Sequence, residues 1–293
     1  MTALAILLFL AAVAMTIARR LRVPPMPILL CCGLGVSALG LAPARESLLS
    51  MLELGLTFLV FAAGVELSPR RFVQQRRPAL WVSGILLLVI GPAGFVTARA
   101  LGVAPLASLY LALTVFASST LVALRELRRR QQTFEPFARV VTGVQLIQDI
   151  VLIVAIVVLA ASAGDAPGIF TALWRAALLG GFAVICQRYL LPWLLIRRRP
   201  DEETLLLTVL ALLFIFAGTA RALGLPVIAG AFLAGFALST FPLNGVVRGQ
   251  LMTLSDFFSA TFFTALGASL VVPELSLLLT ALALAGIVLA ATP

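Results

Sequence analysis

The sequence predicts an all-α polytopic membrane protein of about eleven transmembrane helices arranged as an inverted repeat. Apolar residues make up 62% of the 293 residues, charged residues only 11%, and the mean hydropathy is +1.14, whereas soluble domains are about 45–50% apolar. The apolar residues form runs of about 20 rather than alternating ten-residue segments, which indicates helices. Arginines also gather in alternate loops, and short motifs recur late in the chain.

Eleven apolar segments are long enough to cross a bilayer as helices. In chain order they are 3–18, 26–42, 50–66, 79–98, 105–124, 138–161, 169–187, 204–220, 224–240, 252–271 and 275–291.

The positions of the arginines explain the net charge of +9. All 21 basic residues are arginine, and most fall in alternate loops: 19, 20, 22, 70, 71, 76, 77, 125, 128, 129, 130, 139, 188, 197, 198, 199 and 248. The positive-inside rule assigns these loops to the cytoplasm and the N-terminus to the outside. The charge therefore indicates membrane topology, and the lipid bilayer rather than nucleic acid is the expected partner.

Asp149 lies near the middle of the apolar segment 138–161. An ionised carboxylate is costly there and is usually functional. Thr142 and Gln145 lie on the same helical face, and Gln148 lies beside it. Because burial disfavours the charged form, such a group suits reversible uptake of protons or cations. The alternative is a structural aspartate paired with an arginine or with a broken-helix backbone.

Two sets of residues recur late in the chain and indicate an internal repeat. Ala18, Arg19, Leu21, Pro24 and Gly33 recur at an offset of 202 as Ala220, Arg221, Leu223, Pro226 and Gly235, and Gly64 and Leu67 recur at an offset of 203 as Gly267 and Leu270. Seven spans separate the two copies, so the second enters the membrane the other way up, as in many secondary transporters. We expect repeat one over about 1–161, a linker helix over about 169–196, and an incomplete repeat two over about 203–293.

Three adjacent hydroxyl residues, Ser118, Ser119 and Thr120, lie inside the apolar segment 105–124. They can rebond backbone groups where a helix is interrupted, or they can serve as ordinary packing residues between helices. Their combination with Asp149 favours a site built on an interrupted helix.

The chain has no histidine, and Cys31, Cys32 and Cys186 lie in apolar spans without metal-ligand spacing. We expect the cysteines to be small core residues, with no cofactor and no resident metal. An intramembrane enzyme is disfavoured because paired acids and a nucleophile with a histidine partner are missing.

An ordered set of motifs connects these features. It consists of Ala18-Arg19-Arg20-Leu21 with Pro24-Pro25, Phe58-Leu59-Val60-Phe61, the segment 64–71, Ala117-Ser118-Ser119-Thr120, Gln148-Asp149, Gly224-Leu225-Pro226, the segment 230–235, and Phe262-Phe263 with Gly267. Together these motifs resemble the monovalent cation/proton antiporter family, in particular Kef-type potassium efflux proteins and their sodium/proton antiporter relatives.

The resemblance implies two inverted repeats that form a core moving against a dimerisation and scaffold domain in a bacterial inner membrane. A monovalent cation, Na⁺ or K⁺, would be exchanged for protons by alternating access, in a protein that is a homodimer. The family's ion-binding acid maps onto Asp149, preceded by Gln148, and its interrupted helix maps onto Ser118 to Thr120. Thr142 and Gln145 would form a polar access face, and the transported ion would be the only metal.

Departures from the family pattern leave alternatives open. Electrogenic sodium/proton members carry two adjacent acids, whereas this chain has Gln148-Asp149, which favours one cation per proton. Those members also place a lysine on span ten, and this chain has none. Family members continue for two more helices, so we expect a C-terminal truncation. The alternatives are a truncated, non-transporting membrane subunit and a sodium-coupled symporter of an organic anion.

Overall fold

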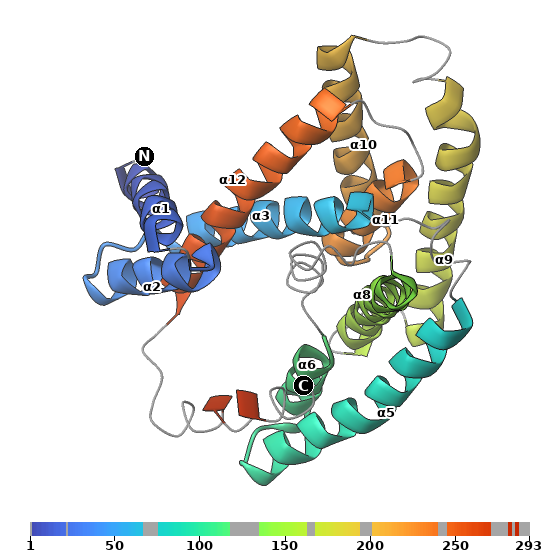
Figure 1. Cartoon of the computed structure of the whole chain (residues 1–293), viewed down its shortest axis with the longest axis horizontal. Coiled ribbons are helices and arrows are strands. Elements are labelled where there is room, and N and C mark those ends of the chain that lie inside the picture. Colours follow the sequence, from blue (N-terminus) through green and yellow to red (C-terminus); the bar gives the residue numbers. More distant parts are fainter. Residues whose placement is uncertain are drawn as a thin grey trace. The chain divides into compact units, whose positions relative to one another are not determined.

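The computed structural model describes residues 2–21, 23–66, 76–117, 135–162, 168–193, 201–239, 245–270, 281–282 and 285–286. Its helices are α1 (Thr2–Leu21), α2 (Pro25–Ala38), α3 (Arg45–Glu66), α5 (Arg76–Ala100), α6 (Pro105–Phe116), α8 (Pro136–Ser162), α9 (Ile169–Ile185) with the π-helical η1 (Cys186–Leu190), α10 (Glu202–Ala222), α11 (Val227–Ser239) and α12 (Gly245–Ser269), as Figure 1 shows. In the described part, 6 helices are long and apolar enough to cross a membrane. Each of the first ten expected spans overlaps a described helix, but in the span 105–124 the helix covers only Pro105–Phe116. Most of 275–291 lies outside the described residues.

The helices form two compact units. The first unit comprises Met1–Leu67 and Ala160–Val272, and the second comprises Ser68–Leu159 and Pro273–Pro293. Helices α1, α2, α3, α9, α10, α11 and α12 therefore belong to the first unit, whereas α5, α6 and almost all of α8 belong to the second.

Local sequence signals explain several helix ends. Helices α2 and α6 begin with Pro25 and Pro105, because the first turn needs no backbone N–H donor and suits the fixed φ of proline. Helix α10 has two acidic residues in its first turn and Arg221 in its last turn, which complements the helix dipole. It ends before Gly224, whose φ of +68° favours glycine.

The junctions after α1 and α10 have matching hydrogen bonds. The amide of Val23 donates to the carbonyl oxygen of Ala18 at 3.2 Å, and the amide of Leu225 donates to that of Ala220 at 2.9 Å. These two bonds are separated by the same offset of 202 that relates the sequence motifs. Similar residues in the two halves of the chain therefore adopt a similar local structure.

Two pairs of glycines allow helices of the first unit to cross at close range. Gly33 on α2 faces Gly267 on α12, and Gly64 on α3 faces Gly235 on α11. A Cβ atom on Gly33 would lie 2.1 Å from a backbone carbonyl oxygen of α12, and one on Gly235 would lie 2.2 Å from a backbone carbonyl oxygen of α3. These crossings leave no room for a side chain at the glycine positions. Each of them packs a helix from the first part of the chain, α2 or α3, against one from the last part, α12 or α11.

Helices α3 and α12 run antiparallel, as Figure 1 shows. Leu48, near the start of α3, shares an apolar cluster with Ala268, near the end of α12. Farther along α3, the ring of Phe58 stacks on Phe258 with the ring centroids 3.9 Å apart. Helices that carry matching glycines thus cross in opposite directions.

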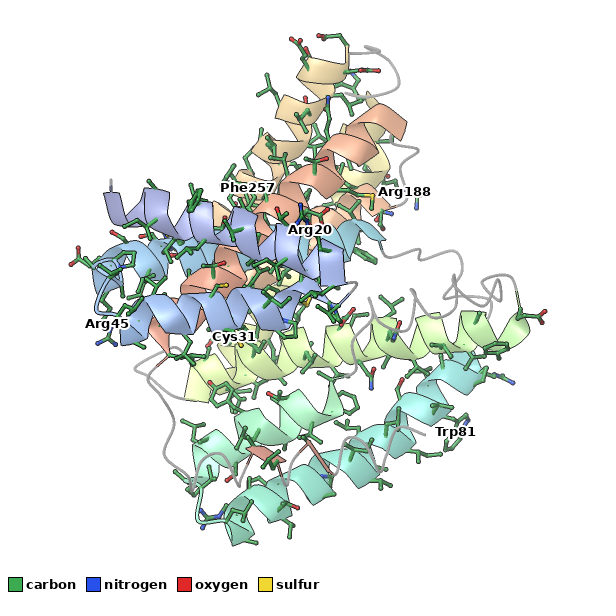
Figure 2. The ribbon with its side chains drawn as sticks, turned by 60° about the vertical axis from the view of Figure 1, so that its left-hand side comes forward. Arg20, Cys31, Arg45, Trp81, Arg188 and Phe257 are labelled. Carbon is green, nitrogen blue, oxygen red and sulfur yellow. The ribbon has the colours of Figure 1, made fainter. Side chains whose placement is uncertain are left out.

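Apolar side chains cover much of the outer surface of these helices. Trp81 on α5 is 75% exposed and projects from the helix in Figure 2. Cys186 is buried and Cys32 is half-buried, but Cys31 is exposed on α2. The expectation that all three cysteines are core residues is therefore wrong for Cys31. Because α2 is apolar on all sides, an apolar side chain there does not have to face the protein core.

Candidate functional site

The predicted ion-binding acid lies in the middle of a long helix. Helix α8 has 27 residues and is therefore about 40 Å long, with Asp149 near its centre. Asp149 is half-buried, whereas Gln148 and Gln145 are buried, at 2% and 3% exposure. Thr142 lies on the same helix, but its side chain is outside the described part. Polar side chains thus occupy the middle of an apolar helix.

Helix α6 ends well before the end of the apolar segment 105–124 in which it lies. It has 12 residues and a length of about 18 Å, too short for a hydrocarbon layer of about 30 Å. The next residue, Ala117, is extended, with φ −71° and ψ 112°. The helix therefore ends at Phe116, inside the predicted span. The candidate residues Ser118, Ser119 and Thr120 lie outside the described residues.

A hydrogen bond joins the end of α6 to the residue beside Asp149. The side-chain Nε2 of Gln148 donates to the carbonyl oxygen of Phe116 at 2.9 Å, and both residues are buried. The last carbonyl groups of a helix have no partner within the helix, and burying one without a donor is costly. Gln148 therefore satisfies a helix end that neither lipid nor a continuing helix satisfies.

Gln145, one turn before Gln148, has a buried side-chain oxygen. Its Oε1 is buried and accepts no hydrogen bond in the described part of the chain. Gln145 lies one helical turn before Asp149, on the same face of α8. An amide oxygen and a carboxylate are the kinds of ligand that hard monovalent cations accept, so these two residues form a candidate ion-binding pair.

Helix α5 supports both α6 and α8 within the second unit. Ser83 Oγ donates to the carbonyl oxygen of Val144 at 3.4 Å, next to Gly143, where α5 and α8 approach closely. Farther along the same face, α5 contacts α6 where Gly94 meets Ala112. The two glycines let both helices lie against α5, which positions the end of α6 close to the middle of α8.

The structure also identifies partners for charged residues elsewhere in the chain. Arg175 Nη1 on α9 donates to the carbonyl oxygen of Leu223 at 2.8 Å, so this arginine caps the end of α10. Glu53, which the sequence analysis did not consider, pairs with Arg221. The sequence feature that could have identified Glu53 is its position as an acid inside the apolar segment 50–66. Both interactions lie in the first unit, whereas the candidate ion site lies in the second.

A comparison with known protein families identifies the family of the chain. The sequence model of the transmembrane sodium/hydrogen exchanger family matches residues 5–292. The chain belongs to this family. The predicted membership of a monovalent cation/proton antiporter family is thereby confirmed, and the family is one of membrane transporters rather than enzymes.

Individual relatives are similar over much of the chain. The glutathione-regulated potassium-efflux system protein KefC of Klebsiella pneumoniae is 28% identical over 247 residues, which are 82% of this chain and 40% of KefC. The K(+)/H(+) antiporter subunit KhtU of Bacillus subtilis is 26% identical over 284 residues, 90% of this chain and 68% of KhtU. The chain thus spans about two fifths of KefC.

A solved structure shares the fold. The sodium proton antiporter MjNhaP1 from Methanocaldococcus jannaschii matches with a TM-score of 0.71, covering 97% of this chain and 75% of that one. The sequence identity is 17%, so the likeness concerns the fold. It confirms the predicted antiporter-like helical fold.

Proposed function

We propose that this chain exchanges a monovalent cation, K⁺ or Na⁺, for protons across a membrane by alternating access, with Asp149 as the binding carboxylate. The observation that supports this most is the position of Asp149 at the middle of α8, beside a glutamine that donates to the last residue of α6. A charged side chain at membrane depth is usually part of an ion pathway.

Competition for one carboxylate couples the two ions. Asp149 binds either a proton or a dehydrated cation, and each of them neutralises its charge. Moving the bare carboxylate through a low-dielectric region costs several kcal/mol. Only the neutralised site therefore changes sides rapidly. A single acid beside Gln148 supports an exchange of one cation for one proton, which moves no net charge.

The rest of the ion shell would come from neutral oxygens. The unpartnered Oε1 of Gln145 is one candidate ligand, because neutral amide oxygens coordinate hard cations. We further propose hydroxyl or backbone oxygens of Ser118, Ser119 and Thr120 as ligands, and Thr142 as part of the access face. The sequence motifs are the basis for proposing these four residues.

We propose that the second unit is the moving core and the first unit is the scaffold, which also forms the homodimer. The second unit carries Asp149 and the interrupted α6. The antiparallel crossing of α3 and α12, whose glycines match in the sequence repeat, supports an inverted repeat within the scaffold. An inverted repeat presents similar structure to both membrane faces and therefore suits alternating access.

We propose a bacterial inner-membrane location with the N-terminus outside. Contacts within the first unit support the alternation of helix ends. Ser37 Oγ donates to the carbonyl oxygen of Leu270 at 3.2 Å, and Arg175 contacts Leu223. In the predicted topology all four residues lie at outer helix ends, while most arginines lie on the cytoplasmic side.

Reconstitution into proteoliposomes tests the proposal. Adding Na⁺, K⁺ or Li⁺ should collapse an imposed pH gradient, and Asp149→Asn should abolish this response because asparagine cannot exchange a proton for a cation. Asp256→Asn makes the same change at an exposed acid on α12 and should retain exchange.

Persistent exchange in the Asp149→Asn protein would refute the assignment. A response that requires an organic anion would indicate the symporter alternative, and the lack of any response in the unaltered chain would indicate a non-transporting subunit.

A further inference from the structure

An ion pair joins the two halves of the first unit. Arg221 Nη2 on α10 contacts Glu53 Oε1 on α3, across 168 residues of sequence. The side chains are 69% and 46% exposed, respectively. Neither residue belongs to the candidate ion site, which lies in the other unit. The pair thus requires an explanation separate from ion binding.

The ion pair lies at one end of the contact between α3 and α10. Five residues farther along α3, Phe58 meets Phe214 of α10 edge to face, with ring centroids 6.1 Å apart and an interplanar angle of 76°. Because Phe214 precedes Arg221 while Phe58 follows Glu53, the two helices run antiparallel. The aromatic contact and the ion pair therefore hold the helices together at two separate levels.

The backbone at or next to both charged residues accepts side-chain hydrogen bonds. Thr57 Oγ1 donates to the carbonyl oxygen of Glu53 at 2.6 Å. Arg221 lies in the last turn of α10, and the following residues are held by the bond from Arg175 to Leu223. Fixing the backbone on both sides lowers the entropy that the two side chains lose on pairing.

The surroundings determine what the pair contributes. In water an exposed pair adds little stability. With the backbone fixed on both sides, we expect a contribution at the upper end of the range for exposed pairs, about 1 kcal/mol. The pair gains this energy only when α3 and α10 lie together, so it favours that arrangement of the two helices.

We propose that Glu53 and Arg221 form a clasp that fixes α3 to α10 and keeps the two halves of the first unit in one arrangement. On the proposed function, the clasp remains closed while transport proceeds. Its role is to give the moving unit a rigid support, not to bind the transported ion.

Thermal unfolding in detergent tests the clasp without reference to transport. Glu53→Gln and Arg221→Gln should each lower the apparent midpoint by about 2–4 °C, the shift expected for a loss of about 1 kcal/mol in a chain of this size. The double variant should be no less stable than either single variant, and the exchange of charges, Glu53→Arg with Arg221→Glu, should recover most of the loss.

Glu46→Gln is the matched control, because Glu46 is also an exposed acid on α3. It should shift the midpoint by less than either clasp variant. The clasp is wrong if the single variants behave like this control, or if the effects of the two variants add in the double variant.

Cross-linking tests whether the clasp stays closed. Glu53→Cys and Arg221→Cys, made in a protein whose Cys31, Cys32 and Cys186 are replaced by alanine, are joined by a short bifunctional thiol reagent. Exchange should continue at the rate of the uncross-linked double variant. Loss of exchange on cross-linking would show that the clasp must open. If the unaltered chain does not transport, the proposed function fails while the unfolding data still decide the clasp.

Discussion

Replacing Gln148 by methionine tests the link between α8 and the end of α6. Methionine has nearly the same length and volume but no N–H donor. The carbonyl oxygen of Phe116 would then lose the bond that Gln148 Nε2 makes at 2.9 Å. We expect Gln148→Met to retain the fold but to release the end of α6 from its position beside Asp149.

The magnitude follows from burial. Gln148 and Phe116 are each 2% exposed, so water does not readily replace the missing donor. Leaving a buried acceptor without a partner costs about 1–3 kcal/mol, which corresponds to about 5- to 150-fold in the population of the arrangement that the bond maintains. The exchange rate should therefore fall at least about fivefold, with a lower unfolding temperature.

The assay is the pH-gradient collapse in proteoliposomes, together with thermal unfolding of the same preparation. Gln250→Met is the matched control, because it makes the same chemical change on α12, in the first unit, and does not alter the bond to Phe116. This control should leave both measurements close to those of the unaltered chain. A Gln148→Met protein that exchanges ions as fast as the control would refute the argument that this bond positions α6.

Two further substitutions test the packing and the ion shell. Gly235→Ala should lower thermal stability by about 1–3 kcal/mol, because its Cβ would lie 2.2 Å from a backbone oxygen of α3. Gly218→Ala is the control and should be neutral or stabilising, because no atom lies within 4 Å of its Cβ. Equal unfolding midpoints for the two variants would contradict the close crossing. Gln145→Leu removes a buried unpartnered oxygen and should raise the cation concentration for half-maximal exchange about tenfold, the equivalent of about 1.4 kcal/mol, without loss of thermal stability. An unchanged concentration dependence would exclude Gln145 as a ligand.

Sequence patterns predicted the positions of most helices, since the length and apolar character of a membrane span are local properties. They predicted the end of α6 less well. The apolar segment continues to residue 124, but the helix ends at Phe116. The donor that satisfies this end is Gln148, 32 residues later. A helix end that depends on a distant side chain cannot be read from the hydropathy of its own segment.

The charged residues show the same limit. Arg175 lies inside the apolar segment 169–187, but only the folded chain shows that it caps α10. Glu53 was overlooked because it lies close to the end of an apolar span, where a carboxylate resembles an interfacial residue. Its pairing with Arg221 depends on how α3 lies against α10, which the separate sequences of the two helices do not specify.

The sequence by itself determined the membrane class, the sites of most spans, the family motifs and Asp149 as the acid of interest. These follow from composition, spacing and the cost of a charge among apolar residues, all of which are local. Tertiary structure decided which glycines face each other, which carbonyl meets Gln148 and which acid meets Arg221. These contacts join residues that are distant in the chain, and helix packing, rather than periodicity, brings them together.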